Sequence, residues 1–207
     1  SKGMGLLSRQ LSRSGIVELV ATTAPGLDDL LVLGRIKAFE RELRADVIVV
    51  DGPAAGHAVD LVRAPIQLKR AINSGPIGQQ ADEVLDMLAD PGRCRMVMVT
   101  TPGVTPVTET VEVVRDMVDS VRATFAPVFV NRVDDPVPPI DVSALSPELA
   151  GAVGYARERA HAQRTAIDQL HEAMTGGHVE LPRRRNAGPA LVQAMAADIE
   201  NGLGLLA

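Results

Sequence analysis

Aromatic residues and cysteine are scarce in this chain. Only 2% of its 207 residues are aromatic, none is Trp, and Cys94 is the single cysteine. Proteins that bind single-stranded nucleic acid use aromatic rings as stacking platforms and a positive surface, whereas this chain has a formal net charge of -5. We therefore expect no nucleic-acid partner. One thiol forms neither an internal disulfide nor a C-x-x-C metal site, so a reducing cytoplasm is the simplest expectation.

Long apolar runs are also absent. No stretch of about 18 apolar residues and no signal-peptide pattern occurs, so we expect neither a membrane span nor export. A hydrophobic fraction of 46% and a charged fraction of 23% are ordinary for a globular protein. At this length the chain can bury a sizeable core, and we expect one soluble α/β domain over residues 1–207 with a short helical insertion at 66–92.

The sequence contains no G-x-x-x-x-G-K-[ST] motif. That motif follows a strand and opens a helix, and its backbone N–H groups and Lys bind nucleotide phosphates. Nothing in the 207 residues replaces it, so we do not expect this chain alone to hydrolyse a nucleotide efficiently.

The most informative stretch runs from Ala45 to Pro65 and reads ADVIVVDGPAAGHAVDLVRAP. Its apolar beginning predicts a strand buried on both faces, as in a parallel sheet covered by helices. Asp51 ends this strand, at the edge where such sheets bind ligands. An acid there meets a cation, a donor or solvent, or it caps the following helix.

Small residues follow Asp51. Gly52, Pro53 and Gly56 carry little side-chain bulk, so the backbone can approach a ligand closely and rearrange easily. His57 comes next and opens a predicted helix. This composition suits a loop that changes conformation with the ligand.

The stretch resembles the family of arsenical-pump-driving and tail-anchored-protein-targeting ATPases, which carry Asp-Thr-Ala-Pro-Thr-Gly-His after a strand. Asp51, Gly56, His57, Leu61 and Pro65 match that pattern, although the loop proline here is one place early. Three further segments match in the family's order and extend the resemblance over roughly residues 14–200: APGLDD at 24–29, APVFVNRV at 126–133 and ELP at 180–182. A Gly-Pro pair and a Gln-Ala-Asp helix after the loop, at 75–76 and 80–82, are similar to the actinobacterial "anion transporter ATPase" branch.

The resemblance implies a P-loop NTPase-like fold of the SIMIBI class without its first strand and phosphate loop. It implies that Asp51 holds Mg²⁺ through water and that Gly52, Pro53, Gly56 and His57 form the switch loop. It assigns the base site to Asn131, Arg132 and Pro182. ATP and Mg²⁺ are the implied cofactors, both only together with the missing phosphate-loop segment, and a homodimer or heterodimer is the implied assembly.

Asn131 allows two interpretations. Its amide offers a donor and an acceptor together, which can pair with the amino group and a ring nitrogen of adenine. Asn at a strand end also simply favours a turn. The resemblance adds weight to the adenine contact.

The chain resembles the C-terminal two-thirds of such an ATPase, as a fragment or a natural short form. The expected function couples ATP hydrolysis to dimer rearrangement and to the handling of a partner or membrane protein. Two alternatives stay open: a non-enzymatic partner subunit or scaffold, and a client carrier with an apolar groove in the helices around Ile66 to Leu88.

Periodicity and turn residues predict the remaining elements. We expect a helix at 27–43, two helices between 66 and 90 that meet at 73–76, and a helix from 146 to about 174. A further helix begins at 105, and its core-facing stripe is Val107, Val111, Val114, Val118 and Val121. A last helix follows Gly188-Pro189, with Val192, Met195 and Ile199 on its inner face. Strands are expected at 94–100, at 128–130 ending at Asn131, and at 178–181.

Two charged features complete the sequence. Arg183, Arg184 and Arg185 form the densest basic run, which we expect to be solvated, with nucleotide phosphates, an acidic partner or lipid headgroups as alternatives. The four histidines lack metal-ligand spacing, so we assign no metal to them.

Overall fold

The computed structural model describes residues 26–42, 45–72, 74–185 and 187–204. The chain divides into two compact units. Unit 1 comprises the chain up to Cys94 together with Met117–Thr124, and unit 2 comprises Arg95–Asp116 and the chain from Phe125. The single domain expected over residues 1–207 stays a prediction.

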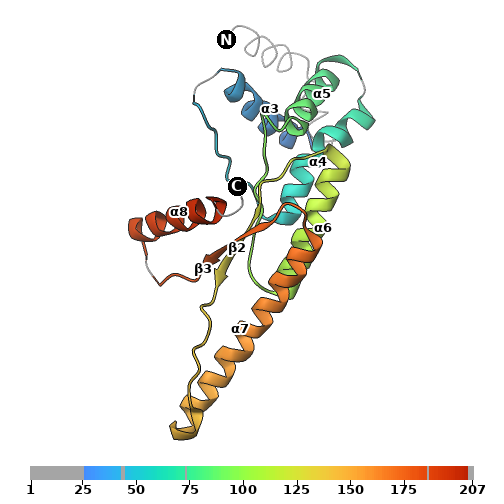
Figure 1. Cartoon of the computed structure of the whole chain (residues 1–207). Coiled ribbons are helices and arrows are strands. Elements are labelled where there is room, and N and C mark those ends of the chain that lie inside the picture. The colour runs from blue at the N-terminus through green and yellow to red at the C-terminus, as the bar shows by residue number, and fades with distance from the viewer. Residues whose placement is uncertain (1–25, 43–44, 73, 186, 205–207) are drawn as a thin grey trace. The chain divides into compact units, whose positions relative to one another are not determined.

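Unit 1 contains three helices that pack against one another: α3 (Leu27–Arg41), α4 (Ala55–Ala71) and α5 (Gly75–Ala89) (Figure 1). The start of α3 lies where Pro25-Gly26 predicts it. Gly26 has φ 88°, a left-handed conformation that glycine adopts without strain, and a Cβ there would meet Ala64 of α4 at 3.0 Å. Asp28 and Asp29 in the first turn favour the positive end of the helix dipole.

The core of unit 1 is formed by the inner faces of these helices. Leu30, Leu68, Ala81 and Val84 are at most 2% exposed. At its margin the ammonium group of Lys37 is buried and donates to Gln80 Oε1 at 2.8 Å and to Glu83 Oε2 at 2.6 Å. The pairing satisfies a charge that would otherwise be costly to bury.

One expectation for unit 1 needs correction at α4. This helix passes through Pro65 to Ala71, so the first of the two helices expected after Ile66 begins already at Ala55. Pro65 removes one backbone hydrogen bond, but its ring is less than 2% exposed and its burial offsets that loss. α4 ends at Ala71 and α5 begins at Gly75, which confirms the expected break between two helices; Asn73 lies outside the described residues.

The strand predicted before Asp51 is wrong for the described structure. Residues 45–54 form neither a helix nor a paired strand, and Val47 and Val49 are 76% and 89% exposed. Apolar residues alone do not make a strand, because each strand needs a neighbour for its N–H and C=O groups. The described part of unit 1 contains helices and supplies no such neighbour.

Unit 2 is built on a parallel sheet of β1 (Val99–Thr100), β2 (Val128–Val133) and β3 (His178–Pro182), in that order. Phe129 of β2 pairs with Val99 on one side and with Val179 on the other. Helices follow each strand: α6 (Val104–Val121), α7 (Pro147–Ala173), preceded by the short helix η1 (Val142–Ala144), and α8 (Pro189–Gly204). Parallel strands need such crossover helices, so the expected α/β class with a parallel sheet is confirmed.

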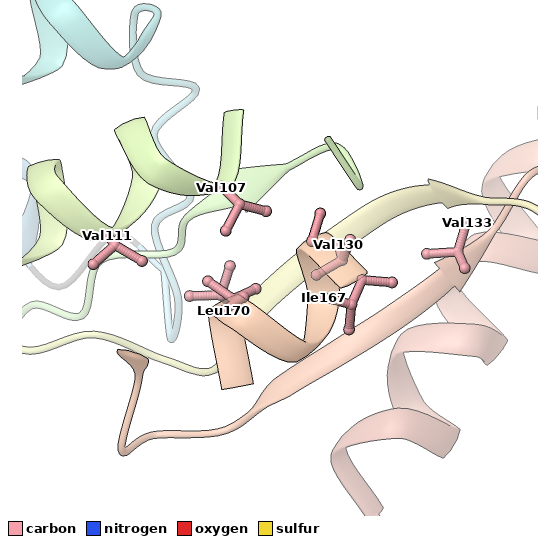
Figure 2. Packing of buried hydrophobic residues seen from close by; sticks show 8 residues of the cluster. Val107, Val111, Val130, Val133, Ile167 and Leu170 are labelled. Atoms are coloured by element: carbon pink, nitrogen blue, oxygen red, sulfur yellow. The ribbon is translucent and has the colours of Figure 1, made fainter. Parts of the chain in front are cut away.

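Helices cover both faces of this sheet. On one face Val128, Val130 and Val133 pack with Val107 and Val111 of α6 and with Ile167 and Leu170 of α7 (Figure 2). On the other face Phe129, Val179 and Leu181 pack with Met195 and Ile199 of α8. Gly202 lets α8 approach closely, because a Cβ there would meet Val179 Cγ1 at 2.2 Å.

The predicted core faces of α6 and α8 are correct except at one position each. Val118 is 44% exposed, while Met117 is 2% exposed. Both residues lie one helical turn after Val114 and one turn before Val121, at the margin of the core-facing stripe. The larger side chain, Met117, is the one that faces the core. Val192 of α8 is 67% exposed.

Length and apolar composition together determine which helices can cross a membrane. Within the described ranges, none combines the length and the apolar composition that a bilayer span requires.

The core on the α7 face generates a stability prediction. Leu170 is fully buried, so Leu170→Ala should lower the free energy of unfolding by about 2–5 kcal/mol through lost packing and a residual cavity. Leu149→Ala is the matched control, because Leu149 lies on the same helix and is 57% exposed; its effect should stay within about 0.5 kcal/mol. Urea unfolding followed by circular dichroism measures both, and equal losses would contradict the packing described here.

Candidate functional site

The predicted switch loop belongs to unit 1 and leads directly into α4. Residues 51–54 are exposed and have no regular secondary structure, and α4 begins at Ala55. The N-cap residue is Ala54, whose side chain makes no capping hydrogen bond, and the first turn contains no acidic residue. Neither a capping side chain nor a first-turn acid therefore neutralises the positive end of α4, which suits an anion.

This geometry excludes one of the two interpretations of Asp51. Asp51 lies three residues before the N-cap, so it does not cap α4. It is exposed in the segment that precedes the helix. Gly56 and His57 lie in the first turn of the helix and are exposed as well.

The predicted base site belongs to unit 2, at the carboxyl ends of β2 and β3. Asn131 lies within β2, not after it as predicted, because the strand continues to Val133 and pairs Asn131 with Leu181. Since alternate strand residues share a face, half-buried Asn131 lies on the α8 face with Phe129. Pro182 pairs with Val133 at the same edge, so two of the three predicted base-site residues lie on adjacent strands.

The third, Arg132, has an unusual backbone. The register between β2 and β3 shifts between Asn131 and Val133, and Arg132 at this bulge has φ 63°. Its side chain is exposed. L-residues other than Gly, Asn and Asp rarely adopt the left-handed region, because the Cβ approaches the following carbonyl oxygen.

An ionic cluster that the sequence does not predict follows directly. Asp134 accepts from Arg159 Nε of α7 at 2.5 Å, from Gln163 Nε2 at 2.9 Å and from Arg183 Nε. The Asp134 backbone N–H donates back to Gln163 Oε1 at 2.9 Å, and the Arg183 N–H donates to Val133 O at 2.7 Å. One carboxylate therefore connects the ends of β2 and β3 to the middle of α7.

A second pair lies beside it. Both terminal nitrogens of Arg164 donate to the Glu180 carboxylate, each at 2.7 Å. This contact holds the pKa of Glu180 below its ordinary value, against the opposing effect of burial. Burial also raises the pKa of Asp134, but hydrogen bonds from Arg183 and Arg159 outweigh it, and the net shift is downward.

A hollow of about 450 Å³ opens at this edge on the α7 face. Its apolar walls are Val133, Pro136, Ala160 and Pro182, and its charged lining consists of Asp134, Asp135, Arg164 and Glu180. Because Asp134, Arg164 and Glu180 are already paired, the hollow presents mostly hydrocarbon and neutralised charge.

The arginine run is more structured than a solvated loop. Arg183 pairs with Asp134, and Arg184 donates to the Asp198 carboxylate of α8 from Nε at 3.0 Å and from its terminal nitrogen at 2.5 Å. Arg185 is exposed. Alternating contacts with β2 and α8 fix the loop after β3.

Asp51 and Asn131 belong to different units, so their facing one nucleotide, as the family resemblance implies, is a prediction. Sequence reasoning missed Asp134, Arg159 and Gln163. An acidic pair, Asp134-Asp135, right after a buried strand was the available signal, but its partners lie 25 or more residues away on α7.

Comparison with known proteins decides the family. The sequence model of the anion-transporting ATPase family matches residues 2–133, more than half of the chain. The chain belongs to this family. The resemblance identified from the sequence motifs is thereby confirmed.

Mycobacterial relatives agree with this assignment. The chain is 30% identical over 135 residues to "ATPase BagA" of Mycobacterium tuberculosis (strain ATCC 25618 / H37Rv) and equally to "Putative ATPase Mb3704" of Mycobacterium bovis. Each alignment covers 62% of this chain and 39% of the relative, so the matched region is well under half of those proteins.

The Asp134 cluster generates a pH prediction. Its folded pKa lies below the ordinary value of 3.8, so the cluster stabilises the fold above that pH and the contribution is lost as pH falls through the folded pKa. Asp134→Asn should cost about 1–3 kcal/mol at pH 7 and flatten the fall in stability below about pH 4. Urea unfolding from pH 7 to pH 3 measures this, and an unchanged acid slope would contradict it.

Proposed function

We propose that this chain contributes the switch loop and the base-recognition edge of a magnesium-dependent ATPase. The observation that carries the proposal is the exposed segment from Asp51 into the uncapped start of α4 in a chain of the anion-transporting ATPase family. An exposed carboxylate followed by a helix start without a side-chain cap is suited to a metal–phosphate group.

The donor chemistry of the loop fits Mg²⁺. This ion keeps several waters and takes one or two carboxylates with phosphate oxygens, so Asp51 suffices as the protein's contact through water. When bound, Mg²⁺ neutralises charge on the phosphates. The backbone N–H groups of Gly52, Gly56 and His57 would then meet the γ-phosphate, and Pro53, which has no backbone N–H, would restrict the conformation of this switch loop.

The base-recognition edge is formed by Asn131, Arg132 and Pro182. The Asn131 amide pairs with the edge of adenine, Pro182 offers an apolar surface, and the exposed Arg132 guanidinium meets anionic or polar groups of the nucleotide. The reaction is phosphoryl transfer to water, in which these residues bind and orient and the transition state is stabilised elsewhere.

The whole protein's action is part of the same proposal. Movement of the switch loop opens and closes a cytoplasmic dimer and thereby handles a partner or membrane protein. Because no G-x-x-x-x-G-K-[ST] motif occurs in its 207 residues, this chain alone releases no phosphate from ATP above background.

The chief rival is a scaffold or partner subunit that binds no nucleotide. The client-groove alternative receives less support. The large apolar side chains around Ile66 to Leu88 are used in the core of unit 1, where Leu68, Val84, Met87 and Leu88 are at most 3% exposed.

Titration calorimetry with magnesium ATP tests the proposal, because the base-recognition edge should bind the nucleotide weakly even though the 207 residues contain no phosphate-loop motif for its hydrolysis. Asp51→Ala and Asn131→Ala should each weaken binding about tenfold, because each removes contacts worth about 1.4 kcal/mol. Asp46→Ala is the matched control, since Asp46 is an exposed acid of the same segment before α4 and its removal should leave affinity unchanged. Absence of binding to the unmodified chain would favour the scaffold.

A further inference from the structure

The strained backbone at Arg132 requires an explanation. Among the described residues, only Arg122 and Arg132 combine a side chain with positive φ. Arg122 follows the end of α6, where its N–H donates to Val118 O at 3.0 Å, and a left-handed residue is common at that position. Arg132 lies inside a strand, where no helix end accounts for the conformation.

Such a conformation persists only when its surroundings impose it. The residues after Arg132 are held from several directions. Val133 O accepts from the Arg183 N–H, and both the backbone and the side chain of Asp134 are bonded to Gln163. Gln163 is 7% exposed and therefore fixed by packing on α7.

The cluster also sets the distance between the strand ends. Arg183 pairs with Asp134 through its side chain and with Val133 through its backbone, one residue after Pro182. Arg159 adds a second guanidinium from α7 to the same carboxylate. The bulge, the β3 end and α7 are thus joined at one side chain.

We infer that Asp134 is a positioning residue: it holds the left-handed bulge at Arg132 and thereby orients Asn131 and Arg132 toward the base of the nucleotide. This inference rests on the proposed function for its ligand, an adenine nucleotide. Asp134 itself touches protein groups only, and its effect reaches the nucleotide through the backbone of residues 131–133.

Affinity for ATP relative to GTP tests the orienting role. Loss of folded protein lowers the apparent binding of both nucleotides equally, whereas a misplaced Asn131 loses its preference for adenine. Asp134→Asn should lower the ratio of ATP to GTP affinity about tenfold, and Arg159→Met should lower it less. Glu40→Gln, which breaks a comparable paired contact with Arg93 in unit 1, is the control and should keep the ratio.

A thermal comparison tests the bulge without any nucleotide. Glycine adopts φ 63° without strain, so Arg132→Gly should raise the melting temperature by about 2–4 °C. In the Asp134→Asn background the bulge can relax, and the same substitution should raise it by clearly less. Equal shifts in both backgrounds would overturn the inference.

The remaining outcomes are distinguishable. If the unmodified chain binds neither nucleotide, the proposed function fails, and the thermal comparison alone decides whether Asp134 imposes the bulge. If binding occurs and Asp134→Asn keeps the wild-type ratio, the inference fails while the proposed function stands. Should Asp134→Asn not fold, Arg159→Met undergoes both comparisons, and an unchanged ratio with an equal thermal shift overturns the inference.

Discussion

The parallel pairing of β2 with strands on both sides is the constraint on which unit 2 depends. Because β2 is the central strand, its alternating residues pack into two hydrophobic cores. Val128 and Val130 pack toward α6 and α7, and Phe129 packs toward α8. A shift of register by one residue would exchange these sets. The strand is therefore fixed along its length, and whatever follows it starts from a rigid platform.

The sheet edge beyond this fixed strand differs from the core in its interactions. Directly beyond the buried strand the chain changes from hydrophobic packing to charge pairing, with Asp134 between two guanidiniums and an amide. Pairs of this kind contribute little when fully solvated, but a partly buried, multiply bonded carboxylate tolerates little displacement. The edge combines an apolar hollow with charges that already have partners.

Local signals in the sequence correctly predicted helix starts, because these depend on residues close together in the chain. Ser146-Pro147 correctly indicated the start of α7, with the Ser146 hydroxyl accepting from the Leu149 N–H, and Gly26 correctly indicated the start of α3. The predictions that required distant partners were less successful. The apolar run at 47–50 was read as a strand although no described neighbour in unit 1 pairs with it, and the Asp134 cluster joins residues up to 49 positions apart.

The start of α4 lacks a side-chain cap, and this absence bears on the binding of an anion. Elsewhere the chain uses a hydroxyl to cap a long helix, whereas α4 begins after Ala54, and alanine is a poor cap by about 1 kcal/mol. The helix tolerates this because its inner face is buried through Val62, Ala64 and Leu68. Packing therefore stabilises a helix whose first amides have no side-chain cap, and the cost of an uncapped start falls when an anion binds there. A serine or aspartate at position 54 would stabilise the free helix and compete with that anion.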